Sequence, residues 1–177
     1  MRPTKADYDR YLWLVQRGNR LGWDEAIMAK DPPFSVADPT LTFVLLRANK
    51  DLAFMSEAFG FPTDEIDHWC RTLEMGCASL RHPETEHYNA INLKSGEHTG
   101  YLTSASFLCW YAGIGDEGML DLLKNTFQDT LYPIPSLDNK SSEFDGLRYW
   151  RGPTWPILNA LIGLGLSDLS LIHISEP

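Results

Sequence analysis

The sequence is poor in positive charge, and its lysines and arginines form no cluster. It has 15 Lys and Arg against 24 Asp and Glu, which gives a formal net charge of −9 over 177 residues. Proteins that bind nucleic acid need a basic surface to neutralise the phosphates. We therefore expect no nucleic-acid partner.

Cysteine is also scarce. The three cysteines, Cys70, Cys77 and Cys109, form no Cys-x-x-Cys pair and lack the Cys/His spacing of a zinc site. Cys70 and Cys77 would lie two turns apart on one helix face, which is too far for a disulfide. Reduced thiols within a core are the simpler interpretation, and they favour a cytoplasmic location.

Several other signals are missing. No apolar run has the length or the flanks of a signal peptide or a membrane span, so we expect no membrane contact. The chain has neither a glycine-rich phosphate loop nor a nucleophile elbow. Its histidines also lack the spacing of metal ligands. The sequence thus predicts neither a metal nor a cofactor.

What the sequence does contain is one helical segment after another, joined by short loops. Asp38 followed by Pro39 is typical of a helix start, because a carboxylate caps free N–H groups and proline fits the first turn. Elsewhere apolar residues recur at helical spacing. The expected helices cover residues 5–18, 23–29, 38–59, 63–82, 102–112, 117–127 and 153–166, and residues 86–94 alternate well enough for a short strand or hairpin arm.

The expected helices are of two kinds. Those over residues 38–59 and 63–82 have one apolar stripe, whereas those over 102–112 and 153–166 are apolar almost throughout. Half-exposed helices that alternate with buried ones fit two concentric layers, as in an all-α toroid with a buried inner ring. An irregular helical bundle would fit the helix content equally well.

Residues 148–155 form an aromatic and cationic block, Arg-Tyr-Trp-Arg-Gly-Pro-Thr-Trp, ahead of the last apolar helix. We expect Pro153 in the first turn of that helix. Aromatic rings beside a helix N-terminus can stack on the C–H faces of a sugar, while arginine and free N–H groups bind hydroxyls or a carboxylate. Taken singly, each ring is more often part of a core. Three aromatics and two arginines so close together favour the rim of a pocket.

This block, together with Pro156, Asn159 and the Gly-Leu pair that follows, resembles a motif of glycoside hydrolase family 63, closest to its bacterial glucosylglycerate and mannosylglycerate hydrolases. Segments at residues 6–11, 33–39, 45–53, 111–114 and 133–136 resemble the same family in the same order. The resemblance implies that residues 1–166 are part of a catalytic domain with a partial (α/α)6 toroid.

The resemblance also implies an activity and a set of contacts. The activity would be hydrolysis, with inversion, of a small α-glucoside or α-mannoside such as a glycosylglycerate. Tyr149, Trp150 and Trp155 would contact the sugar in the −1 region, and Arg151 or Arg148 would hold the loop or a polar group of the substrate.

The pair of carboxyl groups that such chemistry needs is missing. An inverting glycosidase uses an acid and a base about 6.5–9.5 Å apart, with a water between them. Asp38 is explained as a helix cap, and Asp145 is more simply a solvated loop acid. By the resemblance, the acid belongs to an upstream Ser-Gly-x-Asp-Asn-Ser segment and the base is a downstream glutamate, and neither occurs here. We therefore assign no catalytic residue and expect the chain to be a fragment, inactive alone.

The C-terminal residues also lead us to expect a fragment. Residues 167–177 are typical of translated sequencing-adapter sequence in metagenomic reading frames, so we expect a non-native or unstructured tail. A partial toroid would also expose apolar faces of its inner helices. The isolated chain is therefore predicted to be unstable or to associate.

Two other functions stay open. A non-catalytic helical domain could bind or scaffold carbohydrate without turnover. A toroid epimerase or lyase would use other chemistry, although an epimerase would need histidine pairs near the pocket and residues 144–166 contain no histidine. The sugar, the aglycone and the oligomeric state are left open by the sequence.

Overall fold

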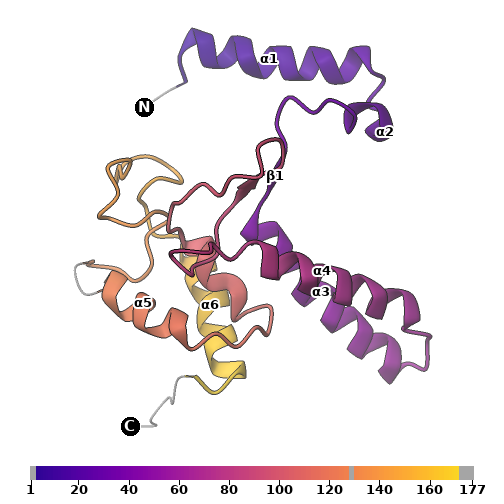
Figure 1. Ribbon diagram of the computed structural model, residues 1–177, viewed down its shortest axis with the longest axis vertical. Coiled ribbons are helices and arrows are strands. Elements are labelled where there is room, and N and C mark those ends of the chain that lie inside the picture. Colours follow the sequence, from indigo (N-terminus) through magenta and orange to yellow (C-terminus); the bar gives the residue numbers. More distant parts are fainter. Residues whose placement is uncertain (1–2, 128–129, 172–177) are drawn as a thin grey trace. The chain divides into compact units, whose positions relative to one another are not determined.

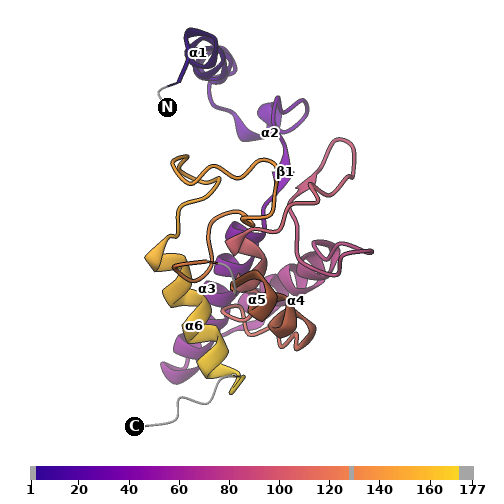
Figure 2. The ribbon, with the colours of Figure 1, turned by 90° about the vertical axis from the view of Figure 1, so that its left-hand side faces the viewer.

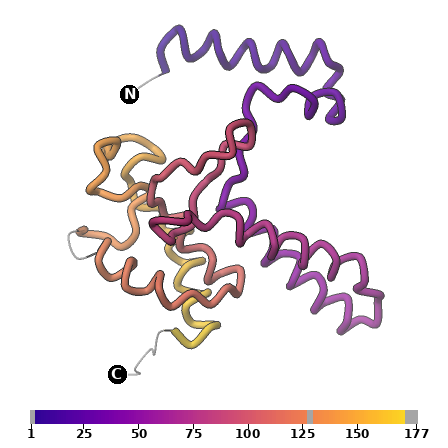
Figure 3. The backbone as a smooth tube through the Cα atoms, in the orientation of Figure 1, coloured from indigo at the N-terminus to yellow at the C-terminus, as the bar shows by residue number. Residues whose placement is uncertain are grey.

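The computed structural model describes residues 3–127 and 130–171, and the chain divides into two compact units, Met1–Val36 and Ala37–Pro177 (Figures 1 and 3). Helices make up most of the described chain, and the described residues contain a single two-stranded sheet. The predicted all-α class is confirmed, together with one small β excursion, the name we give to the segment around residues 86–94.

The first unit contains α1 (Lys5–Arg20) and α2 (Glu25–Met28). Thr4 begins α1 with a capping box, in which its side chain accepts from the Asp7 N–H and the Asp7 carboxylate accepts from the Thr4 N–H at 2.9 Å. The helix runs two residues past Gly18, where the ring of Trp23 packs so closely that a Cβ would collide with it. Glycine at this position lets the chain fold back onto the helix that it has just left.

The second unit begins with a helical hairpin of α3 (Pro39–Ala58) and α4 (Asp64–Ser79), joined by a turn in which Gly60 has a φ of 74° (Figure 1). Asp38 Oδ1 accepts the Leu41 N–H at 3.0 Å, so the predicted helix cap is confirmed. Phe43 of α3 and Cys77 of α4 are fully buried. The hairpin therefore contributes one side of the main core.

The β excursion is smaller than expected. Strands β1 (Val36–Ala37) and β2 (Ile91–Asn92) form the two-stranded sheet, and isolated bridges pair Arg81 with Tyr88 and Ile91 with His98. Within the predicted 86–94 segment, only Ile91–Asn92 is a strand, and Tyr88 adds an isolated bridge.

One expected α-helix is a 3-10 helix. Instead of an α-helix over 102–112, the chain forms η1 (Ser104–Cys109), which packs against both α3 and α6. All of its residues except Ala105 are buried, and Trp110, which follows η1, is fully buried as well. The side chain of Ser106 donates to the Tyr88 carbonyl at 2.6 Å, which ties the segment to the β excursion. For this segment, the sequence predicted the burial correctly but not the type of helix.

After α5 (Gly118–Phe127) and a long loop, α6 (Pro156–Asp168) starts three residues later than predicted (Figure 2). The reason lies in the loop, because Thr154 forms a bridge with Pro135 and the Pro153 carbonyl accepts the Ser136 N–H at 3.1 Å. Trp155 is also held extended as a residue preceding proline. Pro156, not Pro153, therefore occupies the first turn.

Helix α6 buries one face only. Leu158, Ile162 and Leu166 are in the core, whereas Ile157 and Leu164 are more than half exposed, so the expected burial on most sides is wrong. The tail predicted from residue 167 onward overlaps this helix, which continues to Asp168. Residues 172–177 of that tail lie outside the described residues.

Within the described residues, no helix is both long and apolar enough to cross a membrane. All three cysteines are free. Burial raises the pKa of the Cys77 thiol to about 11, which keeps it protonated and unreactive at neutral pH. The cytoplasmic location stays a prediction.

Candidate functional site: an aromatic cluster ahead of α6

Tyr149, Trp150 and Trp155 come together as one ring cluster. The two indoles stack with centroids 4.8 Å apart and an interplanar angle of 27°. Tyr149 packs edgewise, with its centroid 4.5 Å from Trp155 and 5.7 Å from Trp150. Trp155 Nε1 donates to the Tyr149 carbonyl at 2.9 Å, so its polar edge is satisfied within the cluster.

The three rings differ in how far they are exposed to solvent. Trp155 is half-buried and packs against the core. Tyr149 and Trp150 remain 66% and 54% exposed, respectively. Because Trp155 covers one side of Trp150, this outer indole combines a supported side with an accessible one. Such a ring offers a rigid flat surface to a ligand.

The loop that presents the rings is held by its own hydrogen bonds. The Arg151 carbonyl accepts the Asp145 N–H at 2.7 Å, and the Arg151 N–H donates to the Arg148 carbonyl at 2.8 Å. A Cβ on Gly152 would collide with the backbone of Asp145 and Gly146. Glycine is therefore required for this close approach of two chain segments.

The Arg151 side chain is also engaged within the loop. Its Nη2 pairs with Glu143 Oε2 at 2.6 Å and its Nε donates to the Glu143 carbonyl at 2.9 Å. The other arginine of the block, Arg148, is exposed. Arg151 thus crosslinks the two ends of the ring-bearing loop.

Two hollows lie beside Trp150. The first, which we call the Ser104 hollow, has a volume of about 390 Å³ and is lined by Asp38, Thr40, Leu41, Thr103, Ser104, Ala105, Ser136, Trp150 and Leu158. The second, the Arg151 hollow, has a volume of about 340 Å³ and is lined by Thr99, Tyr101, Thr103, Leu137, Glu143, Trp150 and Arg151. Trp150 and Thr103 belong to both, so the hollows are neighbours that share the exposed indole as a wall.

The acids near the rings have structural partners. Asp145 Oδ1 accepts the Leu147 N–H at 3.0 Å and Glu143 pairs with Arg151. Asp38 caps α3. Each of these carboxylates thus has a structural role. The structure gives no reason to assign any of them as a catalytic residue, and the sequence analysis assigned none.

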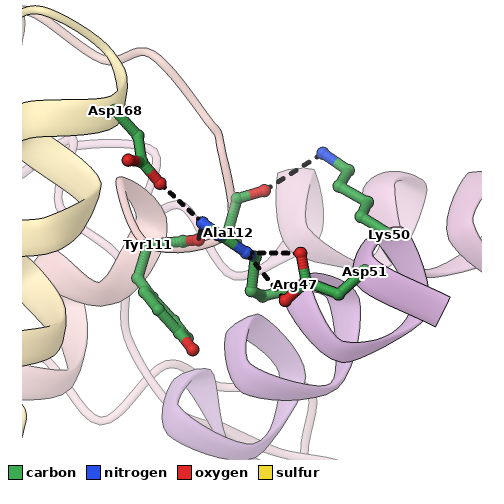
Figure 4. Close-up of polar contacts among 6 residues, drawn as sticks. All are labelled: Arg47, Lys50, Asp51, Tyr111, Ala112 and Asp168. Atoms are coloured by element: carbon green, nitrogen blue, oxygen red, sulfur yellow. Dashed lines mark hydrogen bonds and ion pairs between the residues drawn. The ribbon is translucent and has the colours of Figure 1, made fainter. Parts of the chain in front are cut away.

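Arg47 of α3 connects its helix with α6 and with the segment after η1, an arrangement that sequence reasoning missed (Figure 4). Its Nε donates to Asp51 Oδ1 at 2.9 Å, and its Nη1 donates to Asp168 Oδ2 of α6 at 2.9 Å and to the Tyr111 carbonyl at 3.3 Å. The hydrogen bond to Asp168 is the main cause of the raised pKa of Arg47. Arg47 therefore fixes α6 against α3. Only the Arg47–Asp51 pair, one helical turn apart, had a signal in the sequence.

The fold also gathers three histidines that have no characteristic spacing. The ring of His82 lies 5.1 Å from that of His98 and 6.4 Å from that of His87, measured between centroids. Burial lowers the pKa of His87. Among the described residues no group of three His, Cys, Asp or Glu side chains is arranged to hold a metal ion.

Solved structures place this arrangement in a class. The crystal structure of the family 63 mannosylglycerate hydrolase from Thermus thermophilus in complex with glucose matches with a TM-score of 0.90 and 34% identity, covering 96% of this chain and 42% of that chain. The fold is thus that of the (α/α)6 toroid glycoside hydrolases.

Sequence relatives narrow the class to a family. The model of the mannosylglycerate hydrolase MGH1-like glycoside hydrolase domain matches residues 1–173. Mannosylglycerate hydrolase MGH1 of Selaginella moellendorffii is 37% identical over 94% of this chain and 35% of its own length. Glucosylglycerate hydrolase of Mycolicibacterium hassiacum is 26% identical over 90% of this chain and 39% of its own length. The chain belongs to the MGH1-like glycoside hydrolases of family 63, and it spans less than half of these relatives.

Proposed function

We propose that this chain carries part of the sugar site of an inverting glycoside hydrolase acting on a small α-mannoside or α-glucoside, such as a glycosylglycerate. The observation that carries the proposal is the supported, half-exposed indole of Trp150 between two hollows. The names of the relatives, mannosylglycerate and glucosylglycerate hydrolases, supply the substrate class.

In this proposal the three rings have different tasks. The accessible side of Trp150 stacks on the C–H face of the sugar, with Tyr149 at its edge. Trp155 supports the outer indole and anchors the cluster to the core. Arg151 holds the loop through Glu143, although a direct contact with a polar group of the substrate remains the alternative role.

We further propose that the catalytic acid and base lie outside residues 1–177. Asp145 and Glu143 in the ring-bearing loop already serve as a turn partner and an ion-pair partner, and Asp38, which lines a hollow with Trp150, serves as a helix cap. The chain alone would then be inactive, and activity would require the completed protein, meaning this chain together with its flanking coding sequence.

The test is hydrolysis of mannosylglycerate and glucosylglycerate by the completed protein and by its Trp150→Ala and Trp155→Phe variants. Losing the aromatic wall should cost about 1.5–3 kcal/mol of apolar contact in Trp150→Ala, which corresponds to a roughly 10- to 100-fold lower kcat/KM. Trp155→Phe should have a smaller effect, because a phenyl ring can still support Trp150. The 177-residue chain should hydrolyse neither substrate.

Trp69→Ala is the matched control, since Trp69 is a comparably exposed indole on α4. It should leave kcat/KM within about twofold of the unsubstituted protein. Sugar binding without turnover by the completed protein would favour the non-catalytic binding domain instead. Equal kcat/KM values of Trp150→Ala and Trp69→Ala would mean that Trp150 does not contact the sugar.

A further inference from the structure

Residues 134–138 run between the ring-bearing loop and the segment that leads into η1. On one side, Ser136 Oγ accepts the Gly152 N–H of the ring-bearing loop at 2.9 Å. On the other side, Leu137 forms a bridge with Thr103. Residues 134–137 are all buried. The 134–138 segment therefore connects the loop that carries the rings with η1.

The backbone is strained where this segment begins. Ile134 has a φ of 28°, outside the regions that a β-branched residue normally adopts. Such conformations persist only where the surrounding contacts enforce them, and they are frequent at functional sites. The Ile134 side chain is 4% exposed and belongs to the main core. Its carbonyl is buried with it and needs a hydrogen-bond donor.

Asn159 of α6 supplies that donor. Its Nδ2 donates to the Ile134 carbonyl at 3.2 Å and, one turn back along its own helix, to the Trp155 carbonyl at 3.1 Å. Both partners are carbonyl oxygens, which only accept, so the amide nitrogen must face them. One carboxamide therefore ties the strained peptide to the residue whose ring supports Trp150.

Helix formation does not explain an asparagine at this position. Asparagine favours the N-cap, whereas the N-cap of α6 is Trp155 and Asn159 lies one turn further on. Inside a helix its side chain competes for backbone groups, which makes it less favourable than most residues. The link from α6 to Ile134 gives the position a purpose that the helix alone does not.

We propose that Asn159 is a positioning residue, which holds the Trp155 backbone against the 134–138 segment and thereby fixes the stacked indoles in the arrangement that binds the sugar. It acts through the rings and does not contact the substrate. The inference rests on the glycosidase function proposed above. Without the carboxamide, the strained Ile134 peptide relaxes, the first turn of α6 shifts and Trp150 loses its support.

The kinetic test asks whether substitutions of Asn159 act through Trp150. Asn159→Asp places a carboxylate beside two carbonyl oxygens, and Asn159→Leu removes both donated hydrogen bonds without adding a charge. In the completed protein, each should lower kcat/KM for the glycosylglycerates about 3- to 10-fold. In a Trp150→Ala background, each should cost no more than about twofold, because the ring that Asn159 positions is already gone.

Circular dichroism reports on the rings independently of activity. Two indoles stacked 4.8 Å apart couple their electronic transitions, and the difference spectrum between the unsubstituted protein and Trp150→Ala isolates that signal. Both Asn159 variants should weaken it. Asn49→Asp is the matched control, because Asn49 Nδ2 likewise donates one turn back along its own helix, to the Leu45 carbonyl at 3.1 Å. It should keep the signal and stay within about twofold in kcat/KM.

The outcomes separate positioning from a general loss of stability. An unchanged dichroic signal in both Asn159 variants would overturn the inference, even if their melting temperatures fell. A loss of kcat/KM that is equally large with and without Trp150 would also overturn it. If Trp150→Ala itself retained full kcat/KM, the proposed function would fail instead, while the dichroic signal would still decide whether Asn159 holds the rings in place.

Discussion

At the scale of single residues, Arg151 shows that a cation beside an aromatic cluster need not be a substrate ligand. Its guanidinium already bonds the side chain and the carbonyl of Glu143. Both partners are partly exposed, with 38% and 50% of their side chains accessible. Exposed ion pairs contribute only about 0–1 kcal/mol to stability. The Arg151–Glu143 pair therefore matters mainly because it fixes the conformation of the loop, and it contributes little to stability.

A double-mutant cycle distinguishes the two roles of Arg151. If it acts through Glu143, then Arg151→Ala and Glu143→Gln should each lower kcat/KM by a similar few-fold factor, and the double variant should be little worse than either. The measurement is kcat/KM of the completed protein, with inhibition by D-glycerate as a second readout. Much larger damage from Arg151→Ala than from Glu143→Gln, together with weaker inhibition by D-glycerate, would mean that Arg151 contacts the substrate directly.

The residues of the candidate site differ in how far sequence could predict them. Tyr149, Trp150 and Trp155 lie within one short block, so their proximity follows from local chain geometry. Ser104 and Thr40 are ordinary residues far from that block. Only the packing of η1 between α3 and α6 brings them to Trp150. The hollow that they line with Trp150 could not be predicted, because no local pattern encodes a cavity.

At the scale of elements, most helices could be predicted because capping and apolar spacing are local signals. The start of α6 could not, because it depends on the Pro135–Thr154 bridge across a loop. The 3-10 geometry of η1 has a similar origin. Gly165 of α6 approaches the backbone at Trp110 so closely that a Cβ would collide with it. Tight packing from both sides thus overrides the helical preference of that segment.

The β excursion carries a pH dependence that its histidines impose. His82 Nδ1 accepts the N–H groups of Glu84 and Thr85 at 3.2 Å. His87 is 6% exposed, and its Nδ1 lies 2.6 Å from Asn89 Nδ2. Because the amide nitrogen can only donate, Nδ1 of His87 must be the acceptor. The His87 ring is therefore neutral in the folded segment.

We expect acid to destabilise this element. Burial lowers the pKa of His87 below its ordinary 6.5, and this effect outweighs the hydrogen bond with the Tyr88 backbone and the charge of Asp138, which both raise it. The unfolded chain then binds more protons than the folded one, so the stabilising contribution is present above pH 6.5 and is lost as the pH falls below it. His87→Gln should lose less melting temperature between pH 7.5 and 5.5 than the unsubstituted protein.

The control for this comparison is His68→Gln, which changes an exposed histidine on α4. It should show the same loss of melting temperature as the unsubstituted protein. For a chain of this size, about 2–4 °C corresponds to 1 kcal/mol of stability, so the difference is within reach of calorimetry. Equal losses in all three proteins would show that His87 stays neutral, or titrates alike, in both states.

At the scale of the whole molecule, the dominant feature is the number of large apolar side chains that are exposed to solvent. Leu12 and Trp13 of α1, Phe54 of α3 and Ile157 of α6 are all at least half exposed. Large amounts of exposed apolar surface are uncommon on stable monomers. It is expected of a chain that spans 35% of one relative and 42% of a matched enzyme structure, because helices elsewhere in a toroid would cover it.

The 177-residue chain should therefore self-associate at micromolar concentration, and the completed protein should not. Sedimentation velocity measures both directly. Phe54→Lys places a charge on the exposed side of α3, where Phe54 is 73% accessible, and should reduce association of the short chain with little effect on its helix content. Lys124→Phe on α5 should increase it. A monodisperse, monomeric short chain with one sharp melting transition would mean that its apolar faces are covered within the chain itself.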